Sequence, residues 1–179
     1  TGDRNTAIGY RSMNASTANF ENTAMGYNSL GGLTTGDQNT AIGAYTLDIN
    51  NTGSANTAVG RGSMGANTEG HENTAVGSYS LAGNTKGDDN VAVGSLALTN
   101  NTEGNWNTAS GYQALYSNTT GTANTASGTG ALSANTTGYN NTALGFSALR
   151  YNTIGYYNAA SGVDALYSNT DGDENTASG

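Results

Sequence analysis

The pentapeptide Asn39-Thr40-Ala41-Ile42-Gly43 decides the fold, because its pattern Asn-Thr-Ala-x-Gly returns every 17 residues along the chain. Eleven copies keep this spacing from Asn5 to Gly179, and among the four named letters only the second ever changes. An internal period of about 20 residues is typical of a solenoid, in which each repeat is one coil and only the stack is stable. We therefore predict a single continuous solenoid over residues 1–179, of about ten and a half coils and without a linker.

The repeat has the form N-T-A-φ-G-x-x-[S/A]-[L/M]-x-x-N-T-x-G-x-x, where φ is usually aliphatic and the first Asn is position 1. A helix is disfavoured, because each Gly, Asn or Thr costs about 0.5–1 kcal/mol relative to Ala in a helix interior. We predict an all-β solenoid with two short strands per coil, one over N-T-A-φ and one around position 9. The N-T-x-G segment has the pattern of a type I turn, in which Gly36, Gly53 and Gly70 would adopt backbone angles that a side chain forbids.

Two columns of the repeat are expected to hold the coils together. At a strand spacing of about 4.8 Å, the position-1 asparagines would form a ladder of side-chain amides along the axis. Position 9 would form the core, where each buried Leu contributes roughly 1.5–3 kcal/mol. The predicted ladder consists of Asn5, Asn22, Asn39, Asn56, Asn73, Asn90, Asn107, Asn124, Asn141, Asn158 and Asn175. The predicted core leucines are Leu30, Leu47, Leu81, Leu98, Leu115, Leu132, Leu149 and Leu166.

The mostly aliphatic position 4 has two interpretations. Side chains alternate along a strand, so positions 1, 3 and 5 face one way and positions 2 and 4 the other. If position 4 faces inward, it joins the leucine core. If it faces outward, it forms an exposed apolar row, which is typical of a subunit interface. The second interpretation gives a candidate self-association stripe of Ile8, Met25, Ile42, Val59, Val76, Val93 and Leu144.

The N-T-A-x-G pattern and the residues that follow it in the repeat resemble known repeat families. N-T-A-I-G followed by a Leu and by N-T-T-G is similar to the head repeats of trimeric autotransporter adhesins, whose units carry an N-S-x-A-I-G core. It also resembles the N-T-A-x-G arrays of phage tail fibres and large bacterial surface proteins. The likeness runs through all eleven copies, although the 17-residue period is longer than that of the adhesin heads. The resemblance implies a β-roll, usually of three chains wound side by side, whose role is attachment to surfaces.

The composition argues against several kinds of partner. The chain contains no Cys and no Pro, and the absence of Pro fits a backbone that is hydrogen-bonded along its whole length. A formal net charge of −8 argues against nucleic acid, since phosphate binding needs clustered Lys and Arg. No segment approaches the roughly 20 apolar residues of a membrane span.

The sequence offers no set of residues for catalysis, and we expect neither an enzyme nor a cofactor. His71 is the sole histidine and occupies the variable position 16, so we expect a solvated side chain. Carboxylates gather in the turn that precedes each N-T-A-x-G segment. We expect a solvated acidic edge there, with calcium binding as the alternative. These carboxylates belong to Asp3, Glu21, Asp37, Glu72, Asp88, Asp89, Asp173 and Glu174.

In other coils, aromatic residues occupy the same two turn positions. Exposed rings on a rigid rod could stack on sugars or on a neighbouring chain, whereas the other interpretation is packing against adjacent coils. The first interpretation adds surface glycans or a host receptor to the candidate partners. The candidate contacts are Trp106, Tyr139, Tyr156 and Tyr157, and Phe20 occupies the same turn.

Together these patterns favour an extracellular, non-enzymatic structural or adhesive fibre at a cell or virion surface. We expect a homo-trimer or an end-to-end filament, and we expect the chain to be part of a longer array, since neither end carries an atypical capping repeat. Ice binding is the alternative, because position 2 is Thr in nine of eleven copies. A carbohydrate-active β-helix enzyme would need clustered acids inside a groove, whereas the acids here follow a variable turn edge.

Overall fold

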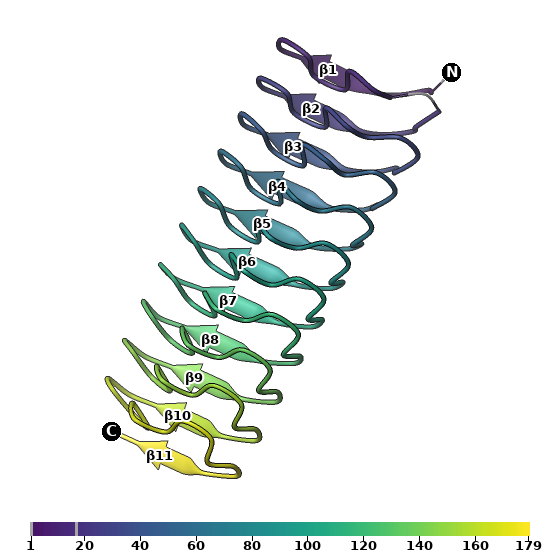
Figure 1. The fold of residues 1–179 in the computed structure, drawn as a ribbon. Coiled ribbons are helices and arrows are strands. Elements are labelled where there is room, and N and C mark those ends of the chain that lie inside the picture. Colours follow the sequence, from purple (N-terminus) through teal and green to yellow (C-terminus); the bar gives the residue numbers. More distant parts are fainter. Residues whose placement is uncertain (1, 17) are drawn as a thin grey trace.

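The chain folds into a β-solenoid of stacked coils, and the computed structural model describes residues 2–16 and 18–179 (Figure 1). Each coil contributes one three-residue strand, and the 11 strands form one parallel sheet in chain order. The strands are β1 (Thr6–Ile8), β2 (Thr23–Met25), β3 (Thr40–Ile42), β4 (Thr57–Val59), β5 (Thr74–Val76), β6 (Val91–Val93), β7 (Thr108–Ser110), β8 (Thr125–Ser127), β9 (Thr142–Leu144), β10 (Ala159–Ser161) and β11 (Thr176–Ser178). The predicted β-solenoid of 17-residue coils is confirmed.

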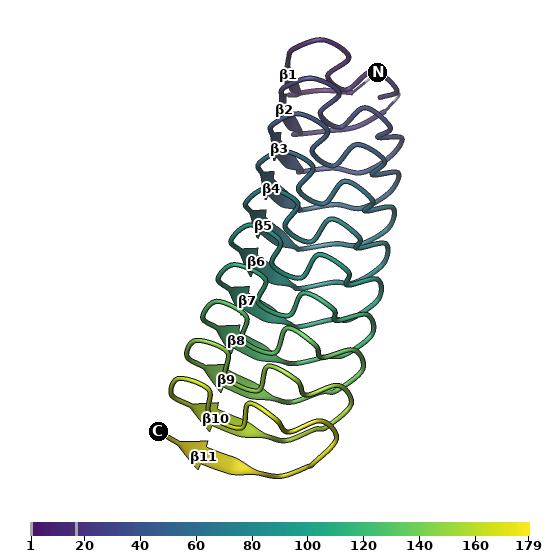
Figure 2. The same cartoon turned by 60° about the vertical axis from the view of Figure 1, so that its left-hand side comes forward.

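The register places equivalent positions of successive coils directly beside one another. In β3 and β4, for example, Ala41 pairs with Ala58 and Ile42 pairs with Val59. The same match holds from β1 to β11, so the strands lie one above another along one side of the rod (Figure 2). A column in the sequence alignment is therefore a column in space.

Backbone hydrogen bonds run along the rod axis outside the sheet as well. The amide of Thr52 donates to the carbonyl of Thr68 in the next coil at 2.9 Å, and the amide of Tyr45 donates to Tyr27 in the preceding coil at 2.9 Å. Each coil is thus bonded to both neighbours through its strand and through its connecting segments. This arrangement satisfies the backbone groups of segments that are too irregular to count as strands.

The predicted second strand around position 9 is wrong: among the described residues each coil has a single strand, and position 9 lies in a chain of tight turns. Leu47, Leu81 and Leu115 have φ values of 48°, 51° and 52°, in the left-handed region. A coil must reverse direction within 17 residues, and this backbone angle turns the leucine inward. Left-handed geometry costs about 1–2 kcal/mol, and burying a Leu returns a similar amount or more.

The predicted role of Gly36, Gly53 and Gly70 is also wrong, because none of them has a positive φ. Glycine is needed there for contact rather than for backbone angle: a Cβ on Gly70 would lie 2.5 Å from the carbonyl oxygen of Gly87 in the next coil. The N-T-x-G segment is closed by a side chain, since the Asn67 amide donates to the Gly70 carbonyl at 3.0 Å. The described glycines with positive φ are those of position 5, such as Gly43 at 136°, and Gly62 and Gly130 of position 7.

The interior of the rod is a thin core of leucine, alanine and asparagine. Most of the position-9 residues, the position-3 alanines and the position-8 residues are buried, and Leu166 near the C-terminal end is half-buried. The fully buried members of the predicted leucine column are Leu30, Leu47, Leu81, Leu98, Leu115, Leu132 and Leu149, and Met64 takes the same place in its coil. A single large side chain per coil therefore supplies most of the apolar packing.

Replacing Leu115 by Ala should destabilise the solenoid by about 2–5 kcal/mol, the cost of deleting a buried leucine and leaving a cavity. Leu115 is fully buried between identical neighbours, so the site has little room to collapse. Urea unfolding followed by circular dichroism would measure the change. Leu166→Ala is the matched control, because Leu166 is only half-buried and should cost clearly less. Equal costs at the two sites would contradict this account of the core.

Candidate functional site

The outer face of the sheet carries the candidate self-association stripe. The position-3 alanines of β2 to β10 are buried, so positions 2 and 4 point away from the core, as Ala41 and its neighbours show. Ile8 is 53% exposed, and Val93 is 41% exposed. The position-4 residues are exposed at Ile8, Met25, Ile42, Val76, Val93 and Leu144, and half-buried at Val59. The outward interpretation of position 4 is therefore the one that the structure adopts.

The apolar character of this face changes along the rod. Position 4 is aliphatic in every coil from β1 to β6, and it is Ser in β7, β8, β10 and β11, with Leu144 of β9 as the exception. No strand residue from β1 to β11 is charged. We call positions 2 and 4 of all 11 strands the outer face, and its β1–β6 part the apolar half.

A shallow apolar depression of about 220 Å³ marks the C-terminal part of the outer face. It lies over β9 to β11, where Ala159 stands in the column that is otherwise mostly Thr. Leu144 borders it on one side and Ser178 on another. Missing side-chain volume at Ala159 and Ser161 thus lowers the surface beside a protruding leucine.

The position-1 asparagines form the predicted ladder inside the rod. The side-chain amide of Asn56 donates to Asn39 Oδ1 at 3.2 Å and to the Gly70 carbonyl at 2.8 Å. The backbone amide of Asn56 donates to the same Asn39 oxygen at 3.0 Å. This arrangement recurs along the rod, so each Asn connects three coils through its side chain.

A second buried asparagine ladder, which the sequence analysis missed, runs along position 12. Asn67 donates to Asn50 Oδ1 at 2.7 Å, and Asn84 donates to Asn67 Oδ1 at 2.8 Å. The signal was present, since position 12 is Asn in every coil from Asn50 to Asn169. The type I turn pattern predicts a turn at this Asn and does not predict that its side chain is buried and closes the turn from inside.

Position 16 acts as a third, exposed line of axial bonds. Most polar side chains here accept a hydrogen bond from a backbone amide of the preceding coil: His71 Nδ1 accepts from Ser54 at 3.1 Å, and Asp88 Oδ1 accepts from His71 at 2.7 Å. Asp37 and Asp173 do the same for Phe20 and Tyr156, at 2.8 Å and 2.9 Å. Some of the acidic turn residues therefore have a structural bond in addition to solvent contact.

The acidic edge does not gather its carboxylates into a cluster. Residues 2–16 and 18–179 contain no group of three or more His, Asp or Glu side chains that could hold a metal ion. The carboxylates of this edge are instead spread along the axis, with one or two in some coils and none in others.

Three of the four candidate aromatic contacts come together, and Trp106 stands apart from them. Tyr139 and Tyr156 stack with ring centroids 4.9 Å apart and an angle of 3° between planes. Tyr157 meets both rings edge-on at 5.7 Å. Asp173 raises the pKa of Tyr156 through a hydrogen bond and through its negative charge. Trp106 is 63% exposed, and Tyr157 is 55% exposed.

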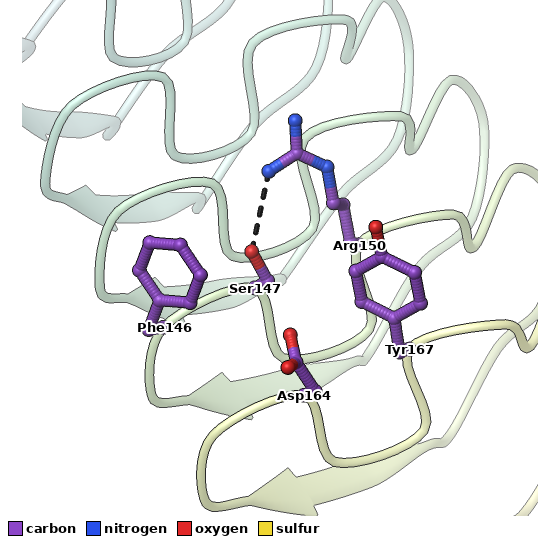
Figure 3. Close-up of a pocket in the computed structure, with 5 residues that line it drawn as sticks. All are labelled: Phe146, Ser147, Arg150, Asp164 and Tyr167. Atoms are coloured by element: carbon purple, nitrogen blue, oxygen red, sulfur yellow. Dashed lines mark hydrogen bonds between the residues drawn. The ribbon is translucent and has the colours of Figure 1, made fainter.

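A groove on a different side of the coil brings together five residues that the sequence analysis did not single out. Phe146, Ser147, Arg150, Asp164 and Tyr167 line an open depression of about 450 Å³ (Figure 3). Arg150 Nη1 donates to Ser147 Oγ at 3.2 Å. The groove is formed by two successive coils. Its first and last residues are more than 17 positions apart in the sequence, so no short motif contains all five.

The groove borders a pair of tyrosines from successive coils, Tyr151 and Tyr167. The rings of Tyr151 and Tyr167 meet edge-on at 5.0 Å and 87°. Donation from Tyr167 lowers the pKa of Tyr151, and the same bond raises the pKa of Tyr167. Arg150 adds to the lowering at Tyr151. Tyr167 is therefore held at the groove edge by a neighbour in the preceding coil.

No helix in the described part of the chain is long and apolar enough to cross a membrane. In comparisons with known proteins, no family model, no curated protein and no solved structure matches the chain.

Proposed function

We propose that this chain is the rigid, non-enzymatic rod of an extracellular structural or adhesive fibre that associates with copies of itself and attaches to a surface. The observation that carries the proposal is the uncharged outer face, with its exposed apolar half, on a rod that is bonded along its whole length. A cell or virion surface is the location that this role implies.

Stiffness is the property that the interior supports. The two asparagine ladders, the backbone bonds and the position-16 acceptors all run parallel to the axis. In residues 2–16 and 18–179 every buried side-chain nitrogen or oxygen has a hydrogen-bond partner. Bending the rod would have to stretch several of these bonds in each coil, and opening it would leave buried polar groups unpaired.

A second copy of the chain is the occupant that best fits the apolar half. Interface cores are depleted in charged residues, and the strands of the outer face contain none. A copy of the same face would match it coil for coil, because both surfaces share the 17-residue period. A homo-trimer and a side-by-side filament both satisfy this condition.

The double variant Val76→Lys/Val93→Lys should convert such an assembly into 18.0 kDa monomers. Two ammonium groups in the middle of the apolar half would have to be desolvated without partners, which costs several kcal/mol. Light scattering gives the mass, and electron microscopy shows whether rods associate. Glu103→Lys is the matched control, because it is exposed and changes the net charge by the same two units without touching the outer face.

Monodisperse monomers of the unaltered chain would contradict the self-association proposal. They would favour the ice-binding alternative, for which the specific observation is that the position-2 threonines share the outer face with position 4. A thermal hysteresis assay on the same sample tests that alternative directly.

A further inference from the structure

Position 7 is a variable position of the repeat, and it carries short side chains or none in three successive coils near the C-terminal end. Position 7 is Gly130, Ser147 and Asp164 there, whereas several earlier coils carry larger side chains such as Tyr45, Tyr79 and Leu96. Two of these residues, Ser147 and Asp164, line the depression of about 450 Å³ described above. Its size falls within the range of small-molecule sites, which is about 300–1,000 Å³.

Arg150 reaches back across this gap towards the preceding coil. A Cβ on Gly130 would lie 2.8 Å from Arg150 Nη1, so the guanidinium occupies space that a side chain at position 130 would take. Arg150 Nη1 donates to Ser147 Oγ at 3.2 Å. Within residues 2–16 and 18–179 no carboxylate lies within ion-pair distance of this guanidinium. Most of its donors therefore remain available to a ligand.

The other groove residues supply an acceptor and two aromatic walls. In Figure 3, Phe146 and Tyr167 stand on opposite sides of the group, with Asp164 between them and Arg150 next to Tyr167. Asp164 is exposed, and its carboxylate is free to accept hydrogen bonds from a ligand. Phe146 is 54% exposed, which leaves ring surface available for stacking.

We propose that this groove binds a neutral hexopyranose unit of a glycan. Adjacent sugar hydroxyls can accept from a guanidinium and donate to a carboxylate at once, and the apolar C–H face of the ring packs on an aromatic side chain. Asp164 and the net charge of −8 disfavour an acidic sugar or another anion. The inference deepens the attachment part of the proposed function and rests on that part alone, since it does not require self-association.

The experiment is saturation-transfer NMR on the intact chain with methyl α-glucoside, α-mannoside and α-galactoside, and with methyl glucuronoside as the acidic probe. A single exposed sugar site predicts a dissociation constant of about 1 mM. Arg150→Ala and Asp164→Asn should each weaken binding of the preferred neutral sugar about tenfold, because each removes a charge-assisted hydrogen bond. Arg61→Ala, which removes an exposed arginine that lies over Tyr79, should leave binding within about twofold.

Circular dichroism of each variant shows that the solenoid remains folded, and light scattering of the same samples reports assembly separately. Binding that is lost in the groove variants and kept in Arg61→Ala supports the site, whether or not the chain self-associates. Absence of transfer to all neutral sugars, or binding of the glucuronoside alone, would overturn the proposal. Binding that Arg150→Ala and Asp164→Asn leave unchanged would place the sugar elsewhere and would overturn it too.

Discussion

Replacing Asn107 by Asp should destabilise the solenoid by about 3–5 kcal/mol at neutral pH, although the two side chains have nearly the same shape. The Asn107 amide donates to Asn90 Oδ1 at 3.1 Å and to the Gly121 carbonyl at 2.8 Å. An aspartate would place a carboxylate oxygen against both of these acceptors. The result is a buried charge with no donor on that side, and two lost hydrogen bonds.

The loss should depend on pH in a defined direction. Burial raises the pKa of the introduced carboxyl above its unfolded value of about 3.9, because the charged form is desolvated. With a raised native pKa, the variant is most stable below about pH 3.9 and loses stability as the pH rises through the native pKa. Urea unfolding between about pH 3 and pH 8 would reveal this trend relative to the unaltered chain. Asn140→Asp is the control, since Asn140 is exposed, and it should show neither the loss nor the trend.

Replacing Gly70 by Ala should cost at least about 3 kcal/mol, the upper end of overpacking penalties. The new Cβ would lie 2.5 Å from both Asn67 Oδ1 and the Gly87 carbonyl, and 2.6 Å from Asn84 Nδ2. Two backbones and the second asparagine ladder would all have to move, whereas a flexible side chain could simply turn away.

Gly65→Ala in the same coil is the matched control for Gly70→Ala. A Cβ on Gly65 meets no atom closer than 3.3 Å, and other coils carry larger residues at this position. We expect a change within about 1 kcal/mol, in the direction of higher stability from reduced freedom of the unfolded chain. Thermal and urea unfolding of both variants measure the difference. Similar stability of Gly70→Ala and the unaltered chain would contradict close coil-to-coil contact at position 15.

The coarse fold could be predicted because repetition removes most alternatives. An unbroken 17-residue period fixes the register of every strand, and the alternation within Thr40–Ile42 fixes which residues share a face. The conformation of Leu115 could not be predicted in this way. Its inward direction follows from hydrophobicity, but left-handed backbone is rare for leucine, and only closure of the coil over a short connection requires it.

The surfaces were predictable only where they follow the repeat. The stripe from Ile8 to Leu144 was visible as a column, although the sequence left its direction open until the burial of the position-3 alanines decided it. The groove at Arg150 was not visible in the sequence. It depends on small residues at Gly130 and Ser147, which lie close to Arg150 only when the coils are stacked. A site formed by residues that differ from those of the other coils does not show up when the repeats are aligned column by column.

The asparagine ladders also give the rod a direction. From Asn56 and Asn67 onwards, each side-chain amide in the two ladders donates to the asparagine of the preceding coil, as Asn56 donates to Asn39 and Asn73 donates to Asn56. The amide dipoles therefore add along the axis instead of cancelling. Wherever such a stack is interrupted, one cut surface offers unfilled acceptors and the other unfilled donors. Two cut surfaces of the same kind repel, so growth by stacking is vectorial: new coils can extend the rod in only one orientation.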